Sequence, residues 1–170
     1  MSETDLAVYT RENALFELTL RNADTASAQF EDVVVEAIDR GIPAEIVTRL
    51  RELWEYTKEV AGEIIAVGRI IVQEIMAFLR DNPGILVGVA LGAVVGSLIT
   101  AIPFFGGLLM PLSMALGALY GAAVGSAYHQ VGQASSDPLA LAVALAEKFT
   151  ELLRKIFVAL TEYFTPKSES

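Results

Sequence analysis

The sequence predicts an all-α integral membrane protein, in which a two-helix transmembrane hairpin is flanked by long amphipathic helices. Three observations predict this class. Residues 82–136 contain no Asp, Glu, Lys or Arg. Within them, residues 84–128 are apolar over about twice the length that one bilayer crossing needs. A break that contains proline and glycine, residues 102–107, divides the apolar run near its middle.

The break indicates a helical hairpin and not one long helix. A single helix over residues 84–128 would be about 65 Å long, whereas the hydrocarbon layer of a bilayer is about 30 Å thick. Proline lacks the amide donor that a helix interior needs, and glycine lets the backbone reverse. We therefore expect a first span at residues 84–102 and a second at residues 108–128. The residues expected in the tight turn between them are Pro103, Gly106 and Gly107.

Both expected spans carry small residues at intervals of four, which places them on one helix face. The first row is Gly84, Gly88, Gly92 and Gly96. The second row is Ser113, Gly117, Gly121 and Gly125. In lipid, close approach of the backbones holds helices together. We therefore expect these rows to mediate helix packing within the hairpin or between copies, and we expect a homo-oligomer.

The rest of the chain divides into segments around the hairpin. These are residues 1–41, with two short amphipathic helices; 42–81, one long amphipathic or interfacial helix; 82–130, the hairpin; and 131–170, a linker and a C-terminal amphipathic helix over 138–164. A third crossing at residues 64–79 remains an alternative. It would bury Arg69 and Glu74, which costs several kcal/mol unless they are paired or hydrated.

Composition argues against several classes of function. The net charge of the 170-residue chain is −9, which disfavours binding to nucleic-acid phosphates. The chain has no cysteine and one histidine, which excludes thiolate and multi-histidine metal clusters. The sequence contains neither a phosphate-binding glycine loop nor a nucleophile elbow. We therefore expect a protein that is not an enzyme and that holds no cofactor or metal.

His129 continues the second row of small residues, four positions after Gly125. Two interpretations stay open. Histidine titrates near neutral pH, so His129 is a candidate protonation switch. Alternatively, it marks the headgroup level of the bilayer, where Tyr120 and Tyr128 are also expected, because amphipathic rings gather at membrane interfaces.

Charged residues near the hairpin indicate its orientation. The first ten residues are polar and acidic and lack the features of a secretory signal peptide. Arg69 and Arg80 precede the first span, and basic flanks stay in the cytoplasm. We therefore expect a multi-pass protein of the inner (cytoplasmic) membrane with both termini in the cytoplasm. No basic run flanks the spans, so anionic lipids are not expected to recruit the chain.

The first span resembles a known membrane anchor. Arg80-Asp81-Asn82-Pro83, followed three residues later by the glycine-rich residues 87–96, resembles the anchor of the ElaB/YqjD family. The resemblance implies a cytoplasmic helical domain tethered to the bacterial inner membrane, with ribosome association as reported for some members. That family has one glycine-rich span, whereas this chain continues with a second span and a further helix.

Three functions are compatible with these features. The first is a membrane scaffold, anchor or curvature-shaping protein that assembles through its glycine rows. The second is an oligomeric pore that is either hydrophobically gated or lined by Ser97, Thr100 and Ser113, or a colicin-like protein whose amphipathic helices first wrap the hairpin. The third is an accessory subunit of a larger membrane complex. Membrane lipids are the expected partners in all three.

Overall fold

The computed structural model describes residues 10–121 and 138–164, and these residues form a helical bundle with one small β-hairpin. The helices are α2 (Arg11–Thr25), α3 (Phe30–Asp39), α4 (Ala44–Trp54), α5 (Val67–Asp81), α6 (Val87–Ala101), α7 (Phe105–Tyr120), α9 (Pro138–Phe149), α10 (Glu151–Ala159) and α11 (Thr161–Phe164). The strands are β1 (Lys58–Val60) and β2 (Glu63–Ile65). The prediction of a mostly helical fold is confirmed.

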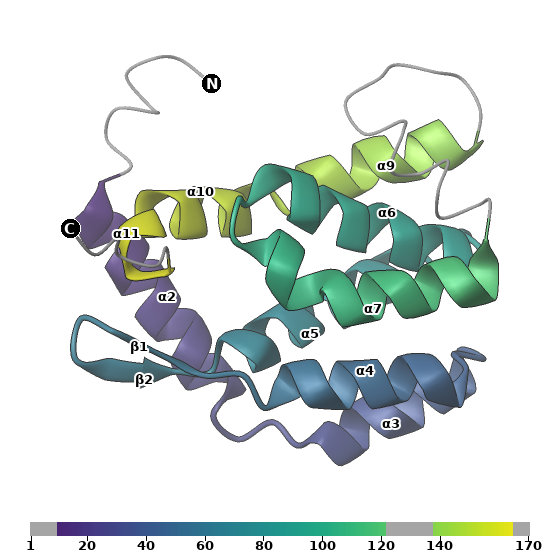
Figure 1. Ribbon diagram of the computed structural model, residues 1–170, viewed down its shortest axis with the longest axis horizontal. Helices are drawn as coiled ribbons and strands as arrows, with labels where there is room; N and C mark the ends of the chain where they lie inside the picture. The colour runs from purple at the N-terminus through teal and green to yellow at the C-terminus, as the bar shows by residue number, and fades with distance from the viewer. Residues whose placement is uncertain (1–9, 122–137, 165–170) are drawn as a thin grey trace.

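The apolar hairpin α6–α7 occupies the middle of the bundle (Figure 1). In that view α9 and α10 lie above it and α3 and α4 lie below it, while α2 and the β-hairpin close one end. Helix α6 packs against α5, α7 and α9, and α7 also packs against α4. The hairpin is therefore held between the amphipathic helices that precede and follow it in the sequence.

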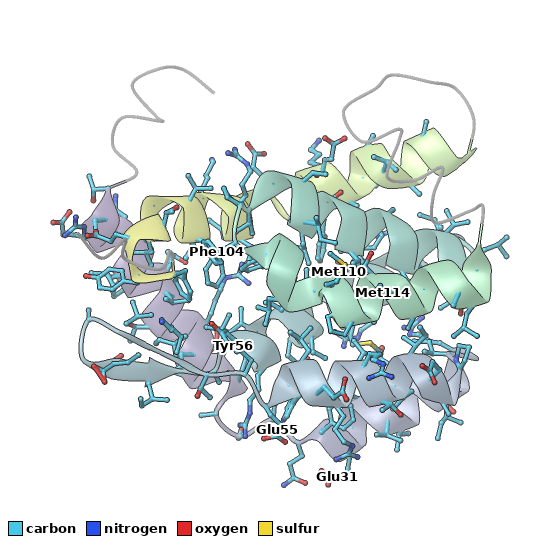
Figure 2. All side chains as sticks on the ribbon, viewed as in Figure 1. Glu31, Glu55, Tyr56, Phe104, Met110 and Met114 are labelled. Carbon is cyan, nitrogen blue, oxygen red and sulfur yellow. The ribbon has the colours of Figure 1, made fainter. Side chains whose placement is uncertain are left out.

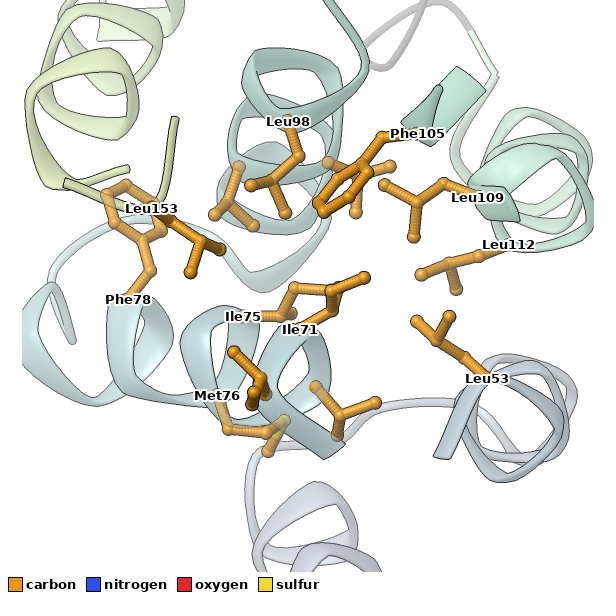
Figure 3. Packing of buried hydrophobic residues seen from close by; sticks show 14 of the residues in the cluster. Leu53, Ile71, Ile75, Met76, Phe78, Leu98, Phe105, Leu109, Leu112 and Leu153 are labelled. Atoms are coloured by element: carbon orange, nitrogen blue, oxygen red, sulfur yellow. The ribbon is translucent and has the colours of Figure 1, made fainter. Parts of the chain in front are cut away.

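The hydrophobic core gathers around α5. Ile71 and Ile75 of α5 are fully buried, and Figure 3 shows them at the centre of the cluster. The core residues that surround them come from α4, α6, α7 and α10 and are Leu53, Leu98, Phe105, Leu109, Leu112 and Leu153. Because helices from both halves of the chain supply these side chains, apolar burial couples the N-terminal helices to the hairpin.

Phenylalanines fix the α6–α7 turn to the C-terminal helices. Phe104 stacks on Phe164 of α11 with ring centroids 4.6 Å apart. Phe105 lies edge-on to Phe157 of α10 at 5.0 Å. Such aromatic pairs contribute about 0.5–1.5 kcal/mol each beyond burial of their area, so they tie the tip of the hairpin to α10 and α11.

The long helix predicted over residues 42–81 is wrong. The chain forms α4, then β1 and β2, and then α5. Ala61 and Gly62 both have positive φ, 52° and 88°, as a two-residue hairpin turn requires. The hydrophobic residues from Val60 to Ile71 fit helical spacing, but Gly62 is favourable for this turn and unfavourable inside a helix.

The β-hairpin folds α5 back onto α4, and Gly68 makes this close approach possible. Its N–H donates to the Tyr56 carbonyl at 2.9 Å. A Cβ at position 68 would lie 1.7 Å from the Leu53 carbonyl oxygen, which is backbone and cannot move aside cheaply. The junction between the N-terminal helices and the core therefore requires glycine at this position.

We predict that Gly68→Ala lowers the free energy of unfolding by about 3 kcal/mol, because the added methyl group overlaps the backbone of α4. Urea unfolding followed by far-UV circular dichroism measures this loss. Gly84→Ala is the matched control, since a Cβ there has nothing within 4 Å. Equal stability of the two variants would contradict the proposed junction.

The spans predicted at residues 84–102 and 108–128 are longer than the helices described there. Helix α6 has 15 residues and α7 has 16. Among residues 10–121 and 138–164, no helix combines the length and the apolar character that crossing a bilayer requires. Residues 83–86 are not helical, so α6 begins only at Val87. Gly121, with φ of 58°, ends α7.

Two further predictions are corrected. Only Pro103 lies in the turn between α6 and α7, while Gly106 and Gly107 lie in the first helical turn of α7. Phe104 and Phe105 hold this reversal through their aromatic contacts, and neither Gly106 nor Gly107 has a positive φ. The single helix predicted over 138–164 is divided into α9, α10 and α11, with breaks at Thr150 and Leu160.

Candidate functional site

Helix α6 is the most completely enclosed element of the hairpin. Every residue from 91 to 98 is buried, so the helix is covered on all sides over more than two turns. A helix that is apolar all round belongs either in a protein core or in a bilayer. The structure shows the first of these environments, which α5, α7 and α9 provide.

The first row of small residues lies mostly inside this enclosure. Gly88, Gly92 and Gly96 are buried in α6, whereas Gly84 precedes the helix and is exposed. A Cβ at Gly88 would lie 2.4 Å from the ring of Tyr120. The glycine therefore provides the space into which α7 places its last aromatic residue.

The second row of small residues does not pack against the first. Ser113 and Gly117 of α7 are half-buried, and a Cβ at Gly117 would have nothing within 4 Å. Gly121 follows α7 and is exposed. Gly125 and the candidate switch His129 lie outside the described residues. Close packing within the hairpin thus uses a glycine of α6 and an aromatic side chain of α7.

Polar side chains are scarce inside the hairpin. Thr100 Oγ1 donates to the Gly96 and Ser97 carbonyls of its own helix, at 3.0 and 3.3 Å. The Ser97 hydroxyl is buried and has no hydrogen-bond partner among the described residues. An unsatisfied buried hydroxyl costs about 1–3 kcal/mol. The enclosed state of α6 therefore carries a polar group that it does not satisfy.

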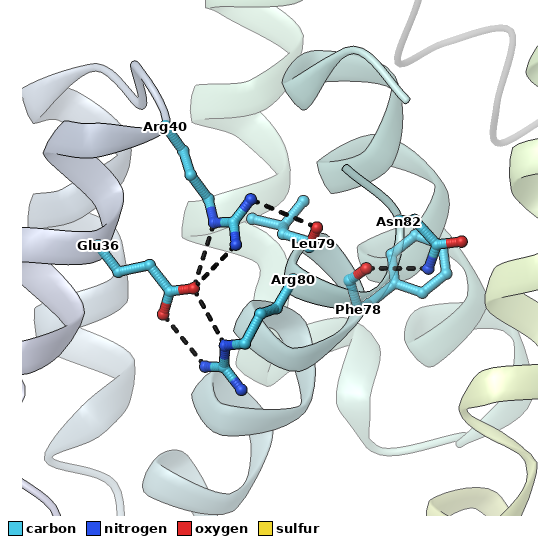
Figure 4. Close-up of polar contacts among 6 residues, drawn as sticks. All are labelled: Glu36, Arg40, Phe78, Leu79, Arg80 and Asn82. Carbon is cyan, nitrogen blue, oxygen red and sulfur yellow. Dashed lines mark hydrogen bonds and ion pairs between the residues drawn. The ribbon is translucent and has the colours of Figure 1, made fainter. Parts of the chain in front are cut away.

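Three charged residues form a cluster at the base of the hairpin, which we call the Glu36 latch (Figure 4). Glu36 Oε1 accepts from Arg80 Nη2 at 3.1 Å, and Oε2 accepts from Arg80 Nε at 3.2 Å. Arg40 also donates to Glu36 Oε2, through Nε at 3.2 Å, and its Nη1 donates to the Leu79 carbonyl at 3.4 Å. The latch joins α3 to the end of α5, two residues before the charge-free stretch begins.

The latch favours the ionised form of Glu36. Hydrogen bonds from Arg80, assisted by the charges of Arg80 and Arg40, lower the pKa of Glu36 below its ordinary value of 4.5. A lowered carboxyl pKa stabilises the folded state above the unfolded pKa, and this contribution is lost as the pH falls through the folded pKa. Acid therefore weakens the attachment of α3 at the base of the hairpin.

We predict that Glu36→Gln lowers the free energy of unfolding at pH 7 by about 1 kcal/mol, because a partly exposed bidentate ion pair is lost. The difference from the unsubstituted chain should shrink as the pH falls below 4.5, the ordinary pKa that applies in the unfolded chain, and should vanish once the pH passes below the lowered pKa of folded Glu36. Urea titrations at several pH values measure both effects. Glu59→Gln, at an exposed position of β1, is the control and should change stability little. A pH-independent effect of Glu36→Gln would contradict the latch.

A second ion pair lies deeper. Glu74 of α5 is 8% exposed, and its Oε1 lies 3.5 Å from Arg21 Nη1 of α2. Burial raises the pKa of Glu74, and the neighbouring Arg21 charge opposes that rise. The next residue, Asn22, accepts from the Ala66 N–H at 2.8 Å and donates to the Ile64 carbonyl at 3.1 Å. Two adjacent polar side chains thus attach α2 to the start and middle of α5.

We predict that Arg21→Ala lowers the free energy of unfolding at pH 7 by about 1–3 kcal/mol, because it leaves a buried carboxylate without its partner. A raised carboxyl pKa stabilises the folded state at low pH, and that contribution is lost as the pH rises through the folded pKa. The deficit should therefore decrease as the pH falls toward 4.5. The double variant Arg21→Ala/Glu74→Gln, which removes the buried charge, should recover most of the stability at pH 7.

One face of α7 is exposed and carries no charge or hydrogen-bonding side chain. We call it the α7 outer face; its residues are Gly107, Met110, Pro111, Met114 and Ala118. Met110 is 51% exposed and Met114 is 67% exposed, and Figure 2 shows both along α7. A surface helix normally presents charged or polar residues on its outer side, so α7 differs from the amphipathic helices around it.

Trp54 of α4 has structural contacts. Trp54 is buried edge-on to Phe30, with ring centroids 5.5 Å apart, and the Arg69 guanidinium lies 5.4 Å from the centroid of the Trp54 ring.

Among the described residues, no group of three His, Cys, Asp or Glu side chains is placed to hold a metal ion. Comparison with protein families, with curated proteins and with solved structures finds no match.

Sequence reasoning did not find the Glu36 latch or the Arg21–Glu74 pair. The i,i+4 spacing of Glu36 and Arg40 is a signal for the first. Local spacing gives no signal for the pairing of Glu36 with Arg80 or of Glu74 with Arg21, because both pairs depend on how α2 and α3 pack against α5. The candidate site is therefore the apolar hairpin together with the ion pairs that attach α2 and α3 to α5.

Proposed function

We propose that this chain is a non-enzymatic membrane-inserting protein of colicin-like organisation. In the enclosed form α5, α7 and α9 cover α6, as in the described bundle. In the inserted form the α6–α7 hairpin enters a bilayer, and the amphipathic helices lie at its surface. The observation that carries the proposal is the burial of residues 91–98 of the charge-free, glycine-rich helix α6 between α5, α7 and α9.

The composition of the hairpin supports this proposal. Each glycine in a helix interior costs about 1 kcal/mol relative to alanine, yet α6 and α7 contain several. In a bilayer, small residues favour association because they let helix backbones approach closely. The rows that begin at Gly84 and Ser113 would then be available for pairing between copies, which is why we propose a homo-oligomer in the membrane.

Hairpin length is compatible with insertion after a modest extension. A helix over residues 84–102, four residues longer than α6, would be about 28 Å long, close to the thickness of the hydrocarbon layer. The sequence after α7 stays free of charge to residue 136. We propose the inner membrane as the location, with the termini on its cytoplasmic side.

A membrane anchor or scaffold is the second candidate function. It is favoured by the scarcity of polar groups on α6, where Ser97 and Thr100 are the residues with hydrogen-bonding side chains. A water-filled pore normally requires a polar or charged lining. In this case the hairpin would insert and assemble without letting solutes pass.

We predict that the full chain releases an encapsulated dye from phosphatidylcholine vesicles. Gly88→Ala should accelerate release several-fold, because its methyl group displaces Tyr120 and loosens α7 from α6. Gly106→Ala is the matched control: it makes the same chemical change in a hairpin helix, outside both rows of small residues, and its Cβ would lie no closer than 3.9 Å to the Ile99 side chain. Membrane insertion without dye release would favour the anchor, and absence of insertion would overturn the proposed function.

A further inference from the structure

A groove lies between α4 and α7, and its apolar wall on α7 stays exposed in the bundle. It has a volume of about 530 Å³, within the range of small-molecule sites. The α7 outer face forms one wall, and Glu45 and Arg49 of α4 stand at the opposite side. A second hollow of about 310 Å³, which shares Arg49 and Pro111, continues along α4 toward Tyr56.

The apolar wall fits a flexible hydrocarbon chain. Met110 and Met114 are exposed there, and methionine adapts its shape to irregular apolar ligands. Gly107 and Ala118 add no bulk to the wall. No side chain of the α7 outer face offers a directional hydrogen bond, so nothing on this wall selects a polar ligand.

The charged wall selects the headgroup. The Arg49 guanidinium lies between two carboxylates, with Nη1 2.8 Å from Glu52 Oε1 and Nη2 3.4 Å from Glu45 Oε1. This order of negative, positive and negative groups is complementary to a zwitterion, whose phosphate would face Arg49 and whose ammonium group would face a carboxylate. An anionic headgroup would meet two carboxylates for one guanidinium.

We propose that the α4–α7 groove binds a zwitterionic phospholipid, with an acyl chain along Met110 and Met114 and the headgroup at Arg49. This inference rests on the proposed membrane function and deepens it. It makes the α7 outer face the surface through which the bundle first meets a bilayer. Recruitment then depends on apolar contact and a zwitterionic headgroup and does not need anionic lipid.

A single-cysteine label tests the proposal, since the chain has no cysteine of its own. Thr48→Cys, at an exposed position of α4 beside Arg49 and outside the groove lining, carries an environment-sensitive fluorophore. The labelled protein is titrated with short-chain phosphatidylcholine below its micelle concentration, so that no bilayer is present. We expect a saturable blue shift, and affinity for the phosphatidylglycerol of equal chain length about tenfold weaker, equivalent to about 1.4 kcal/mol. Phe16→Cys, at a 63% exposed position of α2, is the labelled control and should show no saturable shift.

Further variants test what each wall of the groove contributes to lipid binding. Met110→Asp, in the labelled Thr48→Cys background, should abolish the shift, and Glu45→Lys/Glu52→Lys should reverse the headgroup preference. Equal or tighter binding of phosphatidylglycerol by the chain with both glutamates would overturn the proposal. A lipid-independent shift that grows with protein concentration would also overturn it, because a second copy would then occupy the groove.

Dye release measured on the same labelled protein separates the two proposals. Saturable lipid binding without insertion into vesicles would support the groove and overturn the membrane-inserting function. Dye release by a protein whose label at position 48 shows no saturable binding would overturn the groove alone.

Discussion

The structure depends on covering a helix that has no polar face. Helix α6 is apolar all round, so each of its sides must be removed from water by another element. Three helices from separate parts of the sequence, α5, α7 and α9, meet this requirement. The order of the bundle follows from it: the hairpin lies in the middle, and the amphipathic helices turn their apolar faces inward.

Covering α6 leaves α7 only partly covered. Its inner side supplies Phe105, Leu109, Leu112 and Leu116 to the core, and all four are nearly or fully buried. Its outer side remains apolar and exposed, although α4 lies beside it. Helix α7 is apolar on both sides, but only its inner side is buried. Most surface helices of globular proteins have a polar outer side, and α7 does not.

The attachments of the outer helices differ in how they respond to pH. The Glu36 latch needs an ionised carboxylate, and acid weakens it. The Arg21–Glu74 pair lies in a site that burial makes unfavourable for the charge, so acid relieves a cost there. Because the latch adjoins the base of the hairpin and the buried pair lies along the middle of α5, acid would weaken the attachment of α3 at the hairpin and would not weaken that of α2 in the same way.

Local sequence determined the helical class, the charge-free stretch, the reversal near Pro103 and the amphipathic character of the flanking helices, because each depends on composition and short-range spacing. Tertiary structure decided the rest. Hydrophobic burial has no direction, so the pattern of α6 is the same for a lipid-exposed span and for a core helix, and only the helices around it decide between them. The β-hairpin at Ala61–Gly62, the close approach at Gly68 and the partners of Glu36 and Glu74 likewise depend on contacts between distant segments, which no local period encodes.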